Sequence, residues 1–253
     1  MTAAAPSLET RDLTIRFGGH VAVDAVSCAF RPGELTAIVG PNGAGKTTYF
    51  NLMSGQLRAT GGAVLVRGED VTRLGAPQRA RLGIGRAFQL TNLFPALSVV
   101  ENVRLAVQAR AGVHYEMTRP WMARRDLIDR AEGVLSEVGL SARAMQRVAA
   151  LSHGDQRKLE VAMMMALEPD ILMFDEPTAG MSVDEVPVVL DLIAALKRDS
   201  SKTILLVEHK MDVVRSLADR IVVLHNGRLM ADGAPAEVIA SDIVREAYLG
   251  AAA

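Results

Sequence analysis

The chain has 253 residues and a formal net charge of -1, and charged residues make up 23% of it. This length suits one α/β domain with an inserted lobe, and the balanced charge excludes a global basic field that would attract nucleic acid. The single cysteine, Cys28, cannot form an internal disulfide, and we expect it to pack as a small apolar side chain.

Insertion into a membrane is not expected of the chain itself. The N-terminal residues lack the basic region and apolar run of a secretory signal. The longest apolar runs, such as Ile204 to Val207 and Ile221 to Leu224, have the length of buried strands. Because a bilayer needs roughly 18 apolar residues, any membrane role is expected to come from a partner.

The first part of the chain predicts strands, then a loop and a helix. Two stretches, Leu8 to Phe17 and Val21 to Phe30, flank Gly18-Gly19 and predict a β-hairpin. Leu35 to Val39 predicts a buried strand, followed by a glycine-rich loop and a helix. Residues 62–72 predict further strand and turn.

The middle of the chain, residues 98–168, has little strand pattern, and α/β alternation returns after it. The expected helices are Val99 to Arg110, Arg119 to Val138, Asp155 to Leu167, Val183 to Arg198 and Asp212 to Ala218. The expected later strands are Ile171 to Asp175, Thr203 to Val207, Arg220 to Leu224 and Arg228 to Ala231, with a tight turn at Asn226-Gly227. Apolar strands that alternate with helices predict a parallel sheet covered on both faces, and the helical middle predicts a subdomain inserted between boundaries near 90 and 168.

Residues 40–47 match the phosphate-binding pattern G-x-x-x-x-G-K-[ST] in full. The glycines let backbone N–H groups turn toward phosphate oxygens, and the following helix presents its positive end to the same anion. We expect Lys46 to reach the β- and γ-phosphates and the Thr47 hydroxyl to ligate magnesium. The expected nucleotide-binding residues here are Gly40, Pro41, Asn42, Gly43, Ala44, Gly45, Lys46, Thr47 and Thr48.

Two carboxylates, Asp175 and Glu176, directly follow the apolar residues Ile171 to Phe174. A buried strand delivers them to its C-terminal edge, where ligands of open α/β sheets bind. Asp175 suits the magnesium shell, through a bound water. Glu176 is placed to polarise a water that attacks the γ-phosphate, as a general base or a water-orienting group.

The segment Leu151-Ser152-His153-Gly154-Asp155-Gln156 resembles the signature sequence of ABC ATPases, usually L-S-G-G-Q. Ser152 can cap a helix that starts near Asp155, since Ser-x-x-Asp is a capping-box pattern, and Gly154 allows close approach to an anion. Three further features occur in the family's order and spacing: Gln89 after Arg86-Ala-Phe, Ala179-Gly180-Met181, and His209 in Leu-Val-Glu-His. The resemblance runs from about residue 8 to the C-terminus.

The resemblance to ABC transporter ATP-binding proteins implies an α/β fold of the P-loop NTPase type. Its parts would be a mostly parallel sheet core, an N-terminal antiparallel β subdomain and an inserted α-helical subdomain. One nucleotide-binding domain would span 8–253, with its core in 8–89 and 169–253 and the helical signature subdomain in 90–168. The activity implied is ATP hydrolysis with Mg²⁺.

Further roles follow from the resemblance alone. Phe17 matches the aromatic residue that stacks on adenine, and Val23 is expected to pack against the same ring. Gln89 matches the residue that touches magnesium and the attacking water, and His209 matches the switch histidine near the γ-phosphate. In the family, the signature residues Ser152 and Gly154 bind the γ-phosphate held by the other subunit. The implied catalytic residues are therefore Glu176, His209, Gln89 and Lys46, and the implied metal ligands are Thr47, Gln89 and Asp175.

The chain departs from the family pattern at several positions. His153 replaces the first signature glycine, and Asp155 replaces the usual glutamine. A carboxylate near phosphate is costly unless it points away, and we expect capping to turn Asp155 toward its own backbone. Met163 to Met165, where an arginine is common, are expected in the core, and Ser182 replaces an asparagine in the segment that crosses the dimer interface. These changes leave the turnover rate open.

Within the family, the chain resembles ATPases of branched-chain amino acid importers. The features are Phe17-Gly-Gly with Ala22-Val23, a long helical stretch around 108–130, Leu-Glu-Val-Ala after the signature, and the ending Arg245-Glu-Ala-Tyr248-Leu249-Gly250. Importers of urea and amides share this pattern, and lipopolysaccharide-export ATPases are near relatives. The sequence also leaves open a soluble ABC ATPase that acts on ribosomes or DNA, and a nucleotide-binding regulator without hydrolysis.

The resemblance also implies partners and a location. A second ABC ATPase subunit, identical or homologous, would complete two ATP sites. Transmembrane permease subunits would hold the dimer at the cytoplasmic face of the inner membrane, and a periplasmic substrate-binding protein would act with them. No nucleic-acid partner is expected.

Overall fold

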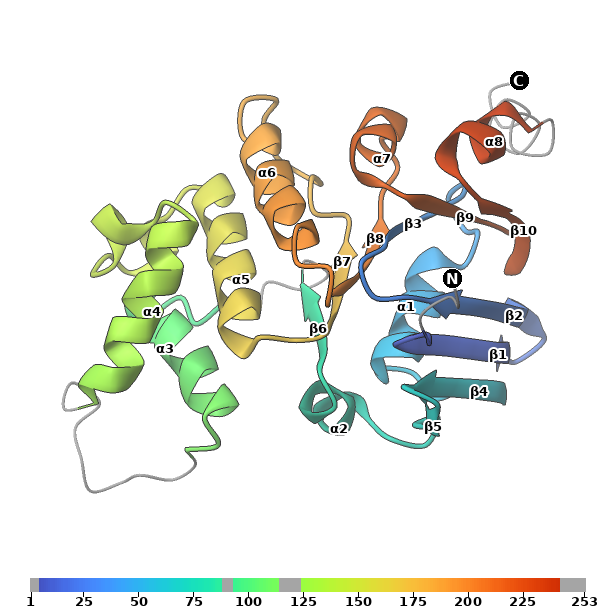
Figure 1. Cartoon of the computed structure of the whole chain (residues 1–253), viewed down its shortest axis with the longest axis horizontal. Helices are drawn as coiled ribbons and strands as arrows, with labels where there is room; N and C mark the ends of the chain where they lie inside the picture. Colours follow the sequence, from blue (N-terminus) through green and yellow to red (C-terminus); the bar gives the residue numbers. More distant parts are fainter. Residues whose placement is uncertain (1–4, 88–92, 114–123, 242–253) are drawn as a thin grey trace. The chain divides into compact units, whose positions relative to one another are not determined.

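The computed structural model describes residues 5–87, 93–113 and 124–241 (Figure 1). These residues form two compact units, each with its own core. Of the described residues, the first unit contains 5–86, 170–176 and 194–241, and the second contains 87, 93–113, 124–169 and 177–193. None of the helices within the described ranges combines the length and the apolar character needed to cross a membrane.

The first unit contains a four-stranded antiparallel sheet in the order β2-β1-β4-β5 (Figure 1). Its first two strands confirm the expected hairpin, with Phe17 opposite His20. The strands are β1 (Leu8–Phe17), β2 (His20–Phe30), β4 (Gly61–Val66) and β5 (Glu69–Asp70).

A six-stranded sheet follows the order β10-β9-β3-β8-β7-β6. Strand β3 pairs in parallel with both β8 and β9, β7 pairs in parallel with β8, and β10 returns antiparallel to β9. The mostly parallel sheet is thereby confirmed. Its strands are β3 (Leu35–Val39), β6 (Ile84–Ala87), β7 (Ile171–Asp175), β8 (Thr203–Val207), β9 (Arg220–His225) and β10 (Arg228–Gly233).

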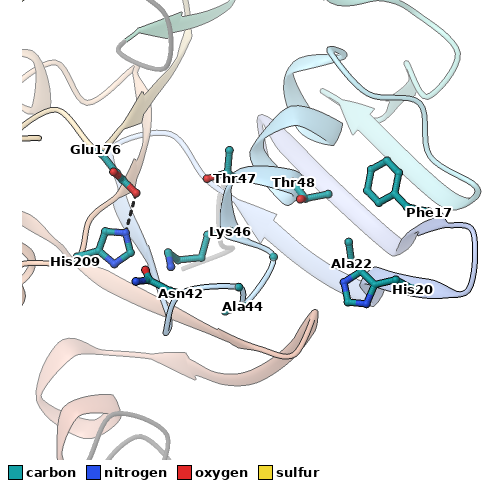
Figure 2. A pocket seen from close by; sticks show the side chains of 12 residues that line it. Phe17, His20, Ala22, Asn42, Ala44, Lys46, Thr47, Thr48, Glu176 and His209 are labelled. Atoms are coloured by element: carbon teal, nitrogen blue, oxygen red, sulfur yellow. Dashed lines mark hydrogen bonds and ion pairs between the residues drawn. The ribbon is translucent and has the colours of Figure 1, made fainter. Parts of the chain in front are cut away.

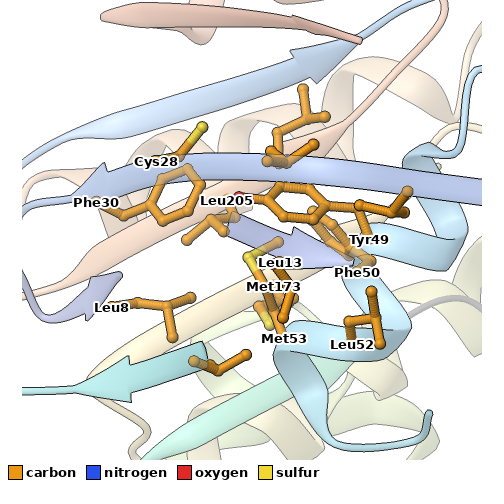
Figure 3. Close-up of a cluster of buried hydrophobic side chains, with 14 of the residues drawn as sticks. Leu8, Leu13, Cys28, Phe30, Tyr49, Phe50, Leu52, Met53, Met173 and Leu205 are labelled. Atoms are coloured by element: carbon orange, nitrogen blue, oxygen red, sulfur yellow. The ribbon is translucent and has the colours of Figure 1, made fainter. Parts of the chain in front are cut away.

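Both faces of this sheet are covered, so its central strands β3, β7 and β8 are buried throughout. On one face, α1 (Lys46–Ser54) packs between the two sheets, and Figure 3 shows its Tyr49 and Phe50 among side chains of both. Cys28 is buried in this cluster, as expected. On the other face, α7 (Met211–Leu217) and α8 (Pro235–Ala240) cover Ala37 and Val39. The short helix α2 (Ala76–Arg81), strand β6 and α8 were not expected from the sequence.

The second unit is helical, and its core joins three helices (Figure 1). They are α3 (Val99–Arg110), α4 (Arg125–Glu137) and α5 (His153–Leu167), and α6 (Val186–Lys197) belongs to this unit as far as Ile193. The structure confirms the predicted bounds of α3. The expected start of α4 at Arg119 lies outside the described residues. Met163 and Met165 pack against this core and Met164 is buried, in agreement with the prediction that the three are core residues.

Candidate nucleotide-binding site

The phosphate loop runs from the buried end of β3 to the first residue of α1, Lys46. Gly45 has a φ of +94°, and a Cβ there would lie 2.4 Å from the carbonyl oxygen of Ala22. A Cβ at Gly40 would lie 2.1 Å from the carbonyl oxygen of Leu224. At Gly45 and Gly40 the loop therefore lies so close to the backbone of β2 and β9 that only glycine fits. Gly43 is different, because its left-handed backbone faces open space.

Lys46 is almost fully buried within this loop. Its Nζ donates hydrogen bonds to the carbonyl oxygens of Gly40, at 2.7 Å, and Pro41, at 3.0 Å. Burial lowers the pKa of Lys46, while Glu176 and Asp175 oppose that shift. The loop thus holds a cation beside the N-terminus of α1, an arrangement that favours phosphate.

A cavity of about 390 Å³ opens over the loop. Figure 2 shows Glu176 and His209 on one side of it and Phe17, His20 and Ala22 on the other. Phe17 is half exposed at the end of β1 and lines the cavity, so part of its ring is available to a ligand. The cavity joins many of the expected residues: Phe17, Asn42, Gly43, Ala44, Gly45, Lys46, Thr47, Thr48, Glu176 and His209.

The structure corrects the placement of Val23. Its side chain is fully buried in the core between the sheets, and Ala22 and His20 line the cavity instead. The reason is an irregularity in the hairpin, where Ile15 pairs with Val23 but the next residue, Arg16, pairs with Val21. The extra residue is Ala22, and such a bulge changes which side chains face the core.

Glu176 and His209 meet at the C-terminal edge of the parallel sheet. Asp175 pairs with Val207 across β7 and β8, so the residues that follow both strands emerge side by side. The Nε2 of His209 lies 2.7 Å from Oε1 of Glu176 (Figure 2). Glu176 has a φ of +51° and donates its backbone N–H to the Val207 carbonyl at 2.9 Å. A left-handed backbone is costly for glutamate, and such strain is common at functional sites.

Asp175 lies beneath the surface at the end of β7, with 4% of its side chain exposed. Burial raises its pKa, and hydrogen bonding to Arg86 opposes the shift. The Nη2 of Arg86 lies 2.7 Å from Oδ2 of Asp175. Arg86 was not expected at the site, although its place three residues before Gln89 is a signal that could have indicated it.

The oxygen donors of this site fit a magnesium ion that is shared with a ligand. Thr47 supplies a hydroxyl and Asp175 a carboxylate, both hard ligands of the kind that Mg²⁺ prefers. Among the described residues, no cluster of three or more His, Cys, Asp or Glu side chains could hold a metal alone. Phosphate oxygens and water would complete the shell, which is usual for Mg²⁺ at nucleotide sites. Gln89, the third expected ligand, lies outside the described residues.

The signature segment lies in the helical unit, at the start of α5. Ser152 has an extended backbone and caps the helix, because its Oγ accepts the N–H of Asp155 at 3.2 Å. The helix therefore begins at His153, two residues before the expected start. The prediction that capping turns the Asp155 carboxylate toward its own backbone is wrong. The carboxylate pairs with Arg143 at 3.0 Å and with Lys158 at 3.1 Å. Two cations thus direct this charge away from the cap.

A carboxylate occupies the N-terminus of α5. Glu185 accepts the N–H of Gly154 at 3.1 Å through Oε1, and its Oε2 accepts the N–H and the hydroxyl of Ser182 at 3.2 and 3.0 Å. These bonds, those from Ser182 first, lower the pKa of Glu185. A Cβ at Gly154 would lie 2.3 Å from Oε1, so only glycine admits this contact. Glu185 was also missed, although Ser182-Val-Asp-Glu185 has the spacing of a capping box.

Comparisons with known proteins agree with this geometry. A family model described as "ABC transporter" matches residues 23–179, and one described as "Branched-chain amino acid ATP-binding cassette transporter" matches 228–253. The chain is 39% identical to the high-affinity branched-chain amino acid transport ATP-binding protein LivG of Escherichia coli K12, over 98% of this chain and 99% of LivG. It is 38% identical to BraF of Pseudomonas aeruginosa, another such protein, with the same coverage.

A solved structure has the same fold. It is the ADP conformation of MJ1267, an ATP-binding cassette of an ABC transporter, and it superposes with a TM-score of 0.83 at 26% identity. The match covers 97% of this chain and 99% of MJ1267. Three findings agree. The family model covers more than half of the chain, the relatives align with nearly its whole length, and the solved structure shares its fold. The chain belongs to the ABC transporter family, as one of its ATP-binding subunits.

Proposed function

We propose that this chain hydrolyses MgATP to drive an importer of branched-chain amino acids or related small polar molecules. One observation carries the chemistry: buried Lys46 and the Glu176–His209 pair line the same cavity over the phosphate loop. The cargo rests on the names of LivG and BraF, which both refer to branched-chain amino acid transport.

The residues of the cavity divide the work between binding and hydrolysis. The loop N–H groups and Lys46 hold the β- and γ-phosphates, and Phe17 stacks on the adenine. Thr47 and Asp175 ligate Mg²⁺, which neutralises phosphate charge when it is bound. Glu176 polarises the attacking water, and His209 holds the Glu176 carboxylate in place. Gln89 is the further residue that this proposal assigns to the metal and to the attacking water.

Two subunits are needed for a complete site in this proposal. We take residues 8–89 and 169–253 as the catalytic core and 90–168 as the signature subdomain. Ser152 and Gly154 of one subunit would bind the γ-phosphate held by the other. The N–H of Gly154 already binds a carboxylate, which supports its use for anions. Glu185 would have to leave when the phosphate arrives.

The remaining parts of the transporter lie in other chains. Permease subunits would anchor the ATPase dimer to the cytoplasmic face of the inner membrane, and a periplasmic binding protein would deliver the cargo. The partner ATPase would be a second copy or a homologous chain. Dimer closure on ATP would change the conformation of the permease, and hydrolysis would reset it.

Uptake in the source cell tests this function. Deletion of the gene should reduce uptake of labelled leucine, isoleucine and valine, and the wild-type gene should restore it. The Glu176→Gln gene should not restore uptake, whereas Glu132→Gln, an exposed change on α4, should. Normal uptake in the deletion strain would reject the cargo. Restored uptake with Glu176→Gln would reject the assigned chemistry.

A further inference from the structure

A buried ion pair joins the acidic strand end to β6. The side chains of Arg86 and Asp175 are 8% and 4% exposed, and Nη2 lies 2.7 Å from Oδ2. The two residues are 89 positions apart in the sequence, so the pair exists only in the folded sheet. Its position matters because Asp175 is the carboxylate that the site offers to a metal.

The same guanidinium group also contacts α1, the helix that begins with Lys46. Its Nη1 donates to Oδ1 of Asn51 at 2.6 Å and to Oγ of Ser54 at 2.9 Å. The Cζ of Arg86 lies 5.7 Å from the centre of the Phe50 ring. Arg86 is therefore held from one side by the phosphate-loop helix, and it holds Asp175 on the other side.

A buried pair of this kind is weak evidence for stability, since the loss of solvation offsets much of the attraction. Burial lowers the pKa of Arg86, and the contact with Asp175 opposes that effect. Removal of Arg86 would leave the buried Asp175 carboxylate without its ion-pair partner. Such a carboxylate attracts a divalent ion more strongly, because the guanidinium no longer repels the ion.

We propose that Arg86 is a positioning residue that balances the charge of Asp175 until magnesium arrives and thereby sets how much magnesium the nucleotide site requires. This inference rests on the proposed function, because it assumes that Asp175 serves a nucleotide-bound Mg²⁺. The competition is electrostatic: a fixed positive charge beside Oδ2 reduces the affinity of the site for a second cation. Asn51 and Ser54 keep that charge in place.

The test measures binding rather than turnover. Purified full-length chain is titrated with a fluorescent ADP analogue at fixed free Mg²⁺ concentrations, with EDTA as the metal-free reference. The half-saturating Mg²⁺ concentration is then compared between variants. Arg86→Met should lower it about tenfold or more, because the repulsion between close charges is large at a buried site. Arg86→Lys keeps the charge and should stay within about threefold of wild type.

Two further variants guard against misfolding and against an indirect effect. Arg86→Gln also removes the charge, but it retains an amide that can bond Asp175, and it should lower the requirement in the same direction. Arg79→Gln is the matched control: Arg79 is buried, and its bonds within the described residues go to backbone carbonyls, including those of Leu52 and Met53 in α1. It should lower the melting temperature and leave the Mg²⁺ requirement unchanged.

The outcomes separate this inference from the proposed function. An unchanged or increased Mg²⁺ requirement in both neutral Arg86 variants would overturn the inference, and so would a shift of equal size in Arg79→Gln. Failure of the wild-type chain to bind the ADP analogue at any Mg²⁺ concentration would instead count against the nucleotide site itself.

Discussion

The Nε2 of His209 and Oε1 of Glu176 lie 2.7 Å apart, although the two residues follow different strands of the sheet. Each side chain is more than one third exposed, so the pair faces the cavity rather than the core. The backbone fixes Glu176 through its bond to Val207, and the imidazole fixes its carboxylate. The pair therefore holds the Glu176 carboxylate in one orientation.

Loss of the histidine should affect turnover more than binding. We expect His209→Ala to lower the rate of ATP hydrolysis about 100-fold, the usual scale for a well-placed proton-transfer system. Affinity for MgADP should change less than about threefold, because Lys46 and the loop remain intact. His20→Ala is the control, since His20 lines the same cavity on the opposite side. Steady-state hydrolysis and nucleotide titration measure both effects. A loss of hydrolysis in His209→Ala that is no larger than the loss in His20→Ala would contradict the role of His209.

The two loop glycines Gly45 and Gly43 should respond differently to alanine. At Gly45, a Cβ would meet the Ala22 carbonyl at 2.4 Å, so the loop has to move away from β2. We expect Gly45→Ala to abolish measurable nucleotide binding. At Gly43, the side chain enters open space and the cost is only the left-handed backbone, about 1–2 kcal/mol.

Gly43→Ala therefore serves as the control for Gly45→Ala. It should fold, melt a few degrees lower and retain ADP binding within about tenfold, which corresponds to roughly 1.4 kcal/mol. Calorimetry and thermal melts of both variants supply the comparison. Equal binding by Gly45→Ala and wild type would show that the close approach to Ala22 is not required.

Replacement of Glu185 by a neutral residue should make the N-terminus of α5 a better site for the phosphate that a partner subunit holds. In the structure, its carboxylate binds Gly154 N–H, where the incoming anion would bind. In a Glu176→Gln background that stops hydrolysis, Glu185→Gln should lower the ATP concentration for half-maximal dimerisation about threefold or more, as expected for removal of a competing charge at a helix N-terminus. Light scattering measures the dimer. Glu132→Gln, an exposed change on α4 away from that segment, should have no such effect. Weaker dimerisation in Glu185→Gln would contradict the competition.

Local patterns predicted most of the fold and the phosphate site. The hairpin, the strands of the mostly parallel sheet other than β6, and α3 follow from periodicity and turn residues. Residues 42–48 line the cavity because a glycine-rich loop between a strand and a helix has few alternative shapes. Boundaries were less certain: Ser152 caps α5 so that the helix starts at His153.

Contacts between distant residues could not be predicted in the same way. Arg86 meets Asp175 only because β6 and β7 are neighbours in the sheet, and no local pattern states that order. Val23 was misplaced because a bulge at Ala22 changes which side chains face the core. Asp155 was expected to complete a capping box, but Arg143 lies close enough to compete for its carboxylate. For Arg86 and Asp155 a tertiary neighbour decides the contact, and for Val23 the irregular pairing of two strands does.

The buried thiol of Cys28 should be inert in the folded protein, and it should make stability depend on pH in the alkaline range. Burial raises its pKa to about 11, whereas an exposed cysteine titrates near 8.5. The folded chain therefore keeps a proton that the unfolded chain loses between these values. This contribution to stability is fully present below about pH 8.5 and is lost as the pH rises toward 11. At pH 8, iodoacetamide should label Cys28 only in denaturant. Urea denaturation should show that the difference in stability between wild type and Cys28→Ala becomes smaller from pH 8 to pH 10.5. Rapid labelling of the native chain, or a gap that widens with pH, would refute this environment for the thiol.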